Sequence, residues 1–268
     1  MQRNLMTRAL ALSFSALAFA AASSAQAHFQ VLYPSAHLLD EPAKVELRLV
    51  FGHPLDNGHV MEMGEPVDFF VAFRGQRTDL KGALEPITWK GPENQARGYR
   101  VSHQVTRNGD YIFALVPAPY YEATEDAFIQ QITKTYLNKG GMPTDWNEPL
   151  GLPAEIVPMN MPTQVLAGGT FTGQVLTEGK PAAGIECEVE FINTEVDIAN
   201  NAFGQGTLVE PPSMPIVTFT DANGFFTFGI PRPGIWGFAC LGAGPETEYE
   251  GKELSQDAVL WVQAIELK

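Results

Sequence analysis

The stretch Lys44-Val-Glu-Leu-Arg-Leu-Val-Phe51 alternates apolar with polar residues. One face of it is wholly apolar and carries Val45, Leu47, Leu49 and Phe51. A period of two is typical of a strand with one buried face. The alternation recurs at residues 67–73, 99–105 and 111–116, and Asn108-Gly109-Asp110 is a turn signal between the last two. The first half of the chain is therefore expected to be rich in strands, with a hairpin at this turn.

Short strands separated by turns also describe the second half. Strand signals occupy residues 168–176, 185–192, 218–228, 233–240 and 258–262. This rhythm is typical of a β-sandwich. The motifs Gly173-x-Val175, Thr220-Asp221-x-x-Gly224-x-Phe226 and Gly234-x-Trp236 follow one another in an order that resembles transthyretin-like or carboxypeptidase-regulatory-like sandwiches. That resemblance implies a structural module without chemistry of its own.

One helix is expected inside the first half. Thr124 is a suitable N-cap, and the acidic run around Glu125 is expected to be the solvated first turn of the helix. Apolar residues then recur every four positions at Phe128, Ile132 and Tyr136, before Gly140-Gly141 ends the pattern. The expected fold is mainly all-β, with two sandwich domains in tandem and this helix inserted in the first.

Prolines mark the expected boundary between the domains. They are frequent from residue 143 onward, and the stretch at residues 158–163 is typical of a linker. We therefore expect an N-terminal domain at residues 28–160 and a C-terminal domain at residues 161–268. Both are long enough to bury a core of their own.

The charge balance excludes one class of partner. The chain of 268 residues has 17 basic and 31 acidic side chains, for a formal charge of −14. Nucleic-acid binding requires clustered Lys and Arg for phosphate contacts, so it is not expected. A negative surface attracts cations instead.

The first 27 residues have the pattern of a cleaved secretory signal. Arg3 and Arg8 precede an apolar stretch at residues 9–22, and Ala25-Gln-Ala27 supplies small residues for cleavage. The stretch is short of the ~20 residues that span a bilayer, and no later run is long enough. We expect a periplasmic protein without a membrane span that begins at His28. The two cysteines, Cys187 and Cys240, are expected to form either a disulfide or two buried thiols.

The distribution of histidine is the main functional clue. All five histidines lie in the first half of the chain and none in the second. Cleavage after Ala27 would give His28 a free α-amine beside its imidazole, and the amine and ring Nδ1 can then chelate one metal ion. An α-amine has a pKa of about 7.7–8.0, low enough for a metal to displace its proton at neutral pH. This arrangement, a histidine brace, suits copper or nickel.

A second group of candidate ligands follows the strand at residues 44–51. His53 lies at the strand end, and His59 lies in a Gly/Asn loop before Met61 and Met63. Imidazole and thioether ligands at this spacing can wrap a soft or borderline cation. Taken alone, the pattern more often marks polar loop residues followed by methionines that fill the core, and only together with His28 do the two interpretations become about even.

The remaining histidines are weaker candidates. His103 lies on the apolar face of its strand between Val101 and Val105, where a core histidine is more common than a ligand, although a ligand there would be held rigidly. His37 is expected to be a solvated loop residue. Since Gly-x-Ser-x-Gly, His-Glu-x-x-His and P-loop motifs are absent from the sequence, an enzyme is not expected.

Several stretches together resemble one family. They are His28-Phe29 after the signal, Phe51-x-His53-Pro54, Met61-x-Met63, Pro117-Ala-Pro-Tyr-Tyr-Glu122, Asp126-x-Phe128-Ile, Glu148-Pro-Leu-Gly-Leu-Pro153-x-Glu155-Ile-Val-Pro158 and the closing sandwich. They resemble the additional periplasmic component of nickel energy-coupling-factor (ECF) transporters over essentially the whole mature chain.

The resemblance implies capture of Ni²⁺ or Co²⁺ and its delivery to membrane transporter subunits. The metal ligands it implies are His28, His53 and His103, with His59 and Met61 as additions. Two other functions fit the residues: a copper chaperone or oxidase that uses the same brace, and a surface or adhesion module that binds no metal.

Overall fold

The computed structural model describes residues 28–208 and 215–267, and its regular structure there is almost entirely β-strand. Within those ranges the only helical segment is one short 3-10 turn, η1 (Lys81–Ala83). The expectation of a mainly all-β, sandwich-like fold is therefore confirmed. The residues expected to form the signal, 1–27, lie outside the described ranges.

The first sheet contains the strand that the alternating stretch predicts. Its order is β1–β3–β8–β7–β18–β17, with β4 paired to β3. The strands are β1 (Phe29–Pro34), β3 (Ala43–Gly52), β4 (Val60–Met61), β7 (Glu85–Lys90), β8 (Gln95–Val105), β17 (Thr194–Asp197) and β18 (Ala202–Gly206). β1 and β8 flank β3 in antiparallel pairing.

The second sheet is the largest and has the order β19–β16–β21–β23–β11–β9–β5–β6. Its strands are β5 (Asp68–Phe73), β6 (Gln76–Asp79), β9 (Gly109–Val116), β11 (Ala127–Lys139), β16 (Glu186–Phe191), β19 (Ile216–Phe219), β21 (Gly234–Cys240) and β23 (Lys252–Ile265). Short strands join it at the sides: β2 (Leu38–Leu39), β10 (Tyr120–Glu122), β13 (Val165–Leu166) and β22 (Glu248–Tyr249). The hairpin expected at Asn108-Gly109 is absent as a direct pair, because β8 and β9 belong to different sheets.

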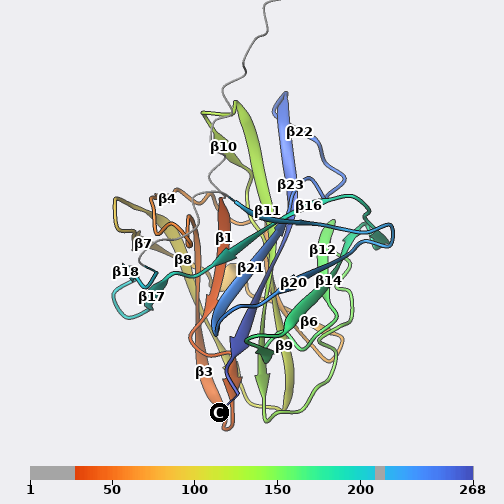
Figure 1. Cartoon of the computed structure of the whole chain (residues 1–268). Helices are drawn as coiled ribbons and strands as arrows, with labels where there is room; N and C mark the ends of the chain where they lie inside the picture. Colours follow the sequence, from red (N-terminus) through yellow and green to blue (C-terminus); the bar gives the residue numbers. More distant parts are fainter. Residues whose placement is uncertain (1–27, 209–214, 268) are drawn as a thin grey trace, which may run out of the picture.

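A small third sheet completes the sandwich. It contains β12 (Ala154–Pro158), β14 (Thr170–Thr177), β15 (Lys180–Pro181) and β20 (Phe225–Gly229). One core lies between the first and second sheets and includes Leu47 and Phe113; another lies between the second and third and includes Phe171 and Leu260. In Figure 1, β11 and β23 run side by side through the centre of the molecule.

The expected helix at residues 124–136 is wrong. Residues from Ala127 onward form β11, which is hydrogen-bonded to β9 on one side and β23 on the other. Phe128, Ile132 and Tyr136 are spaced four residues apart, which was interpreted as helical. An even spacing also places residues on one face of a strand, so this pattern does not distinguish the two. β11 is buried along most of its length, so its polar residues gave no alternation.

The second sheet runs across the expected domain boundary at residue 160. β11 from the first half pairs in parallel with β23 from the second, from Phe128 opposite Leu254 to Lys134 opposite Leu260. The second half also gives β17 and β18 to the first sheet. The two halves therefore share sheets and core, whereas strand patterns alone do not specify partners so distant in sequence.

The two cysteines form a disulfide. Cys187 of β16 lies directly opposite Cys240 of β21, and their sulfurs are bonded. Of the two alternatives that the sequence leaves open, the bonded one is present. The bond links neighbouring strands of the second sheet.

Candidate functional site

Three of the predicted ligand residues gather where β1 begins and β3 ends. Phe29 pairs with Gly52, so the antiparallel register places the adjoining His28 and His53 at the same end of the first sheet. The ring centroids of His28 and His53 are 4.8 Å apart. Those of His53 and His59 are 4.5 Å apart. The structure therefore brings together three imidazoles from two chain segments.

The loop between β3 and β4 returns His59 to His53. Val60 of β4 pairs with Gly52, and the Gly58 amide donates to the His53 carbonyl at 3.3 Å. Asn57 allows the reversal because its φ of 54° lies in the left-handed region, which Asn tolerates better than most residues. The loop is therefore a tight turn that closes on itself.

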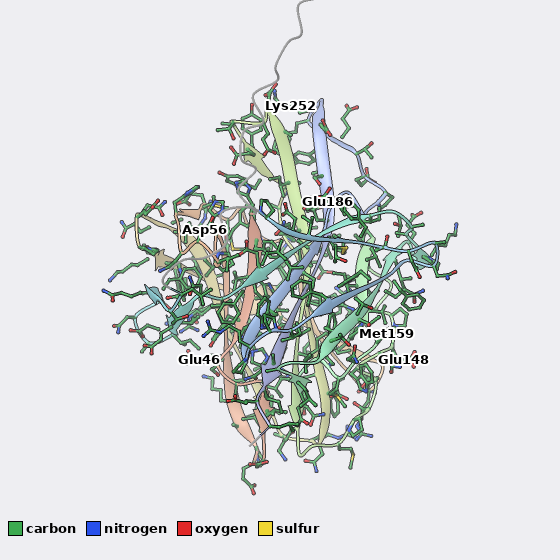
Figure 2. The ribbon with its side chains drawn as sticks, viewed as in Figure 1. Glu46, Asp56, Glu148, Met159, Glu186 and Lys252 are labelled. Atoms are coloured by element: carbon green, nitrogen blue, oxygen red, sulfur yellow. A yellow bond between two sulfur atoms is a disulfide. The ribbon has the colours of Figure 1, made fainter. Side chains whose placement is uncertain are left out.

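The second half of the chain holds this loop in place. The Leu55 amide donates to Glu190 Oε2 at 2.7 Å, and Asn193 Nδ2 donates to the Leu55 carbonyl at 2.9 Å. Asn57 Nδ2 donates to the Gly204 carbonyl at 3.1 Å. Asp56, labelled in Figure 2, is the exposed residue of the turn. Residues far from the histidines in sequence thus fix their spacing.

Glu122 is a member of the site that sequence reasoning missed. Its Oε2 lies 3.0 Å from His28 Nε2, and both side chains are about nine-tenths buried. The amide and hydroxyl of Thr124 donate to the other oxygen, Oε1, at 2.9 and 2.7 Å. The acidic run was expected to be a solvated helix start, but here it is the turn between β10 and β11, which faces Glu122 inward. The sequence carries no signal for this, because His28 is more than ninety positions away.

The ionisation of the pair favours a neutral imidazole beside a carboxylate. Burial lowers the pKa of His28 below its usual value of 6.5, and Glu122 and Glu125 offset part of that effect. Burial alone would raise the pKa of Glu122, but hydrogen bonds from Thr124 and the proximity of His28 leave it lowered. The neutral imidazole is the form that binds metal ions.

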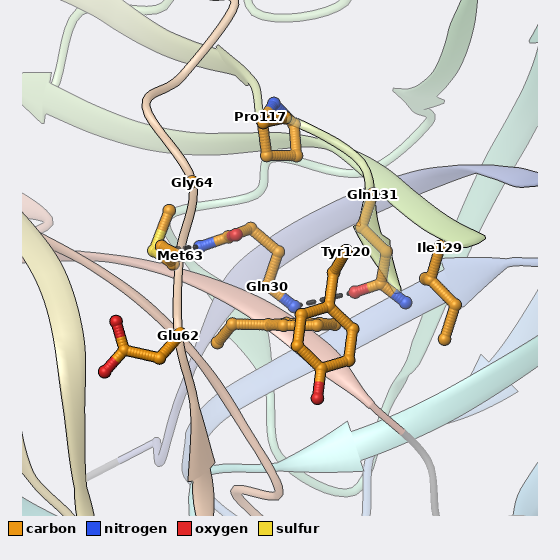
Figure 3. Close-up of a pocket in the computed structure, with 10 residues that line it drawn as sticks. Gln30, Glu62, Met63, Gly64, Pro117, Tyr120, Ile129 and Gln131 are labelled. Carbon is orange, nitrogen blue, oxygen red and sulfur yellow. Dashed lines mark hydrogen bonds between the residues drawn. The ribbon is translucent and has the colours of Figure 1, made fainter. Parts of the chain in front are cut away.

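Gln131 of β11 holds the backbone on both sides of Phe29. Its Nε2 donates to the His28 carbonyl at 2.7 Å, and its Oε1 accepts from the Gln30 amide at 2.7 Å, which Figure 3 shows. The Gln30 carbonyl accepts from Trp261 Nε1 at 2.8 Å. These side chains bond the free edge of β1, where another strand would otherwise pair. The start of β1 is thereby fixed relative to β11.

The cavity beside this cluster is too small for an organic ligand. It is lined by Gln30, Phe51, Met63, Tyr120 and Gln131, among others, and encloses ≈ 10 Å³. That is about the space of one water molecule. The chemistry of the region therefore belongs to the imidazoles and Glu122.

His103 lies apart from the other histidines. It pairs with Val45, so it lies about 23 Å from Gly52 along β3, at roughly 3.3 Å per residue. Its ring is near those of Tyr111 and Phe113, at centroid distances of 5.9 and 5.8 Å. The prediction that His103 shares a metal ion with His28 is therefore wrong: strand parity fixes the face of a residue but not its position along the strand.

Met61 and His37 also differ from expectation. Met61 is 4% exposed and packs in the core between the first two sheets, as does Met63, so the structure places its thioether among apolar side chains. His37 is buried instead of solvated, and its Nδ1 lies 3.0 Å from the Tyr136 carbonyl. The interpretation of Met61 and Met63 as residues that fill the core therefore agrees with their positions.

Over residues 28–208 and 215–267, no group of three or more His, Cys, Asp or Glu side chains is arranged to hold a metal ion. The three imidazoles are close, yet they do not form such a group. In the same ranges, no helix has the length and apolar character needed to cross a membrane.

Comparison with known proteins gives a family and distant structural likenesses. A family model described as a domain of unknown function, DUF4198, matches residues 25–244. No curated protein matches the sequence. The D0–D1 domain of intimin is 12% identical, with 88% of this chain and 100% of that chain covered and a TM-score of 0.25. The adhesin InvE of Yersinia pseudotuberculosis is 11% identical, with 86% of this chain and 58% of that chain covered and a TM-score of 0.24. Likenesses at this level carry no argument about function.

Proposed function

This chain belongs to the DUF4198 family, and we propose that it is a periplasmic protein that binds a divalent transition-metal ion, Ni²⁺ or Co²⁺. The proposed site consists of His28, His53 and His59. The bound ion is cargo, which the protein holds reversibly and passes to an ECF-type importer. The activity is binding and delivery, without catalysis.

The spacing of the three rings is the observation that carries the proposal. With metal–nitrogen bonds of about 2.1 Å, two imidazoles at a right angle around one ion place their ring centroids roughly 4.5 Å apart. The two neighbouring pairs here are separated by 4.8 and 4.5 Å. Rotation of the His53 and His59 side chains, with His28 kept in place and without movement of the strands, would then direct nitrogens of all three rings at one ion.

The kind of donor favours a borderline metal. Imidazole nitrogen suits nickel, cobalt, copper and zinc, whereas Mg²⁺ and Ca²⁺ prefer oxygen. Cleavage before His28 would add the α-amine as a further nitrogen donor. The formal charge of −14 favours the approach of cations from solution. We expect binding to weaken below about pH 6, as imidazoles become protonated.

The importer in this proposal is supported by the family resemblance of the sequence. The motifs that carry it, such as Phe51-x-His53-Pro54, include residues of the proposed site. A periplasmic protein that loads an importer must release its ion, which suits side chains that are close together without a preformed cage. A disulfide is typical of extracytoplasmic proteins, which agrees with the proposed compartment.

Calorimetric titration of the exported protein with NiCl₂ tests the proposal. Mass spectrometry first establishes where the chain begins. We expect one ion per chain, and a loss of affinity of at least about tenfold for His53→Gln, since a ligand is removed. His103→Gln is the matched control, because it removes an imidazole outside the site and should leave the affinity unchanged.

Two results would overturn the proposal in different ways. Absence of binding at micromolar Ni²⁺ and Co²⁺ would favour a surface or adhesion module. Full affinity in both His28→Gln and His53→Gln would show that an ion binds elsewhere.

Competition with Cu²⁺ does not rank the metals by itself, because copper exceeds nickel in affinity for most nitrogen sites. Metal content after growth with each ion separates the nickel carrier from the copper protein.

A further inference from the structure

The contact between His28 and Glu122 specifies which ring nitrogen carries a proton. Glu122 Oε2 lies 3.0 Å from His28 Nε2. The other carboxylate oxygen accepts two hydrogen bonds from Thr124, at 2.9 and 2.7 Å, which orients the group. An ionised carboxylate only accepts hydrogen bonds, so Nε2 must donate.

A neutral imidazole has a single N–H, and this assigns the other nitrogen. If Nε2 is protonated, Nδ1 has the lone pair and is the nitrogen available to a metal ion. Carboxylates that accept from the second ring nitrogen of a ligating histidine are a common means of fixing tautomer and ring orientation. Nδ1 is also the ring nitrogen that lies near enough to the α-nitrogen of the same residue to close a chelate.

The same hairpin holds His28 at a second point. Glu122 ends β10 and pairs with Ala127 at the start of β11. From β11, Gln131 Nε2 donates to the His28 carbonyl at 2.7 Å. The ring and the backbone of His28 are therefore both fixed by the β10–β11 hairpin, which projects at the end of the molecule where β1 begins (Figure 1).

We propose that Glu122 is a positioning residue that fixes His28 in its Nε2–H tautomer, so that His28 binds metal through Nδ1 and not through Nε2. The metal-binding part of this inference rests on the proposed function. The tautomer does not, because the contacts that set it are present without metal. Glu122 acts through His28 and is not itself a ligand.

The tautomer is measured on the metal-free exported protein. Long-range ¹H–¹⁵N correlation spectra of histidine-labelled protein at pH 8 distinguish protonated from unprotonated ring nitrogens. His28→Gln identifies the signals of residue 28. We expect the wild type to show Nε2 protonated, and Glu122→Gln to show a rise in the Nδ1–H form, because an amide both donates and accepts.

Glu125→Gln is the matched control. It removes the same charge from the same turn, and Glu125 acts on His28 only at a distance. We expect the control to keep the wild-type tautomer and to lose less than about threefold in Ni²⁺ affinity. Glu122→Gln should lose about 10–100-fold, as is typical when the partner of a ligating histidine is removed.

Each outcome addresses one of the two proposals. A wild type protonated on Nδ1, or a Glu122→Gln protein with unchanged ring signals, overturns the role of Glu122. A protein with the Nε2–H tautomer that binds no Ni²⁺ contradicts the proposed function and leaves the tautomer assignment standing. Equal losses of affinity in Glu122→Gln and Glu125→Gln would show that charge alone matters, and would also overturn the inference.

Discussion

His37 is the residue whose burial has the clearest consequence for stability. It is 6% exposed, its Nδ1 contacts the Tyr136 carbonyl at 3.0 Å, and burial lowers its pKa to about 4. In the unfolded chain His37 binds a proton at about pH 6.5, whereas in the folded chain it does so only at about pH 4. The contribution of neutral His37 to stability is therefore complete above pH 6.5 and is lost as the pH falls towards 4.

When the pH is lowered from 7 to 4, we expect protonation of His37 to reduce the free energy of unfolding by roughly 3 kcal/mol. Urea unfolding at several pH values measures the change. The comparison is with His37→Gln, which cannot titrate and should show a flatter dependence over the same range. Parallel curves for the two proteins would contradict the prediction.

At the same scale, the sequence predicts part of the site and misses the rest. The alternating pattern predicted His53 at the end of a strand, and the signal pattern predicted His28 as the first residue after cleavage. That His28 adjoins a strand, and that this strand pairs with the one before His53, is known only from the structure. Glu122 and Gln131 were not predicted, because they meet His28 through contacts that span about a hundred residues. Hydrogen bonds of that range leave no local pattern in a single sequence.

At the scale of the strand, Gln131 replaces a missing neighbour for β1. Its amide bonds the Gln30 N–H and the His28 carbonyl, both at 2.7 Å. Gln131→Leu should remove both bonds and leave two backbone groups without partners at a buried position, which costs about 1–3 kcal/mol for each group. The beginning of β1 should then open more often than the strands around it.

Hydrogen exchange of the Gln30 amide measures that opening. We expect faster exchange in Gln131→Leu than in Gln130→Leu, a matched control on the same strand. Gln130 is also buried, but it bonds the Pro117 carbonyl and the Gln256 side chain instead of β1. Equal exchange at Gln30 in the two variants would show that β1 is held by its pairing with β3 alone.

The strand β11 shows why element type was harder to predict than fold class. Alternation identified β3 because only one of its faces is apolar along much of its length, whereas β11 is buried along nearly all of it. Some of its buried polar residues are paired inside the fold, as in the ion pair of Lys134 with Glu155 at 2.7 Å. A strand of this kind has neither a polar face nor a period of two. Its apolar residues at four-residue intervals therefore resemble the pattern of a helix.

At the scale of the whole molecule, the shared second sheet determines how the protein unfolds. β11 and β23 lie at its centre and come from opposite sides of residue 160. The turn that carries His53 is bonded to Glu190 and Asn193 of the second half. Core, sheet and candidate site are therefore each built from both halves of the chain.

We expect a single cooperative unfolding transition, with calorimetric and van't Hoff enthalpies that agree. A chain that ends at residue 160 lacks β23, so β11 has an unpaired edge in what was the middle of a sheet. It should fail to give a dispersed ¹H–¹⁵N spectrum and should not bind Ni²⁺, while the full chain under the same conditions does both. Two separate transitions, or a dispersed spectrum from the fragment, would contradict this expectation. Either result would show that residues 28–160 fold as a domain of their own. Pairing with β9 and β10 would then be enough to order β11 without its parallel partner β23.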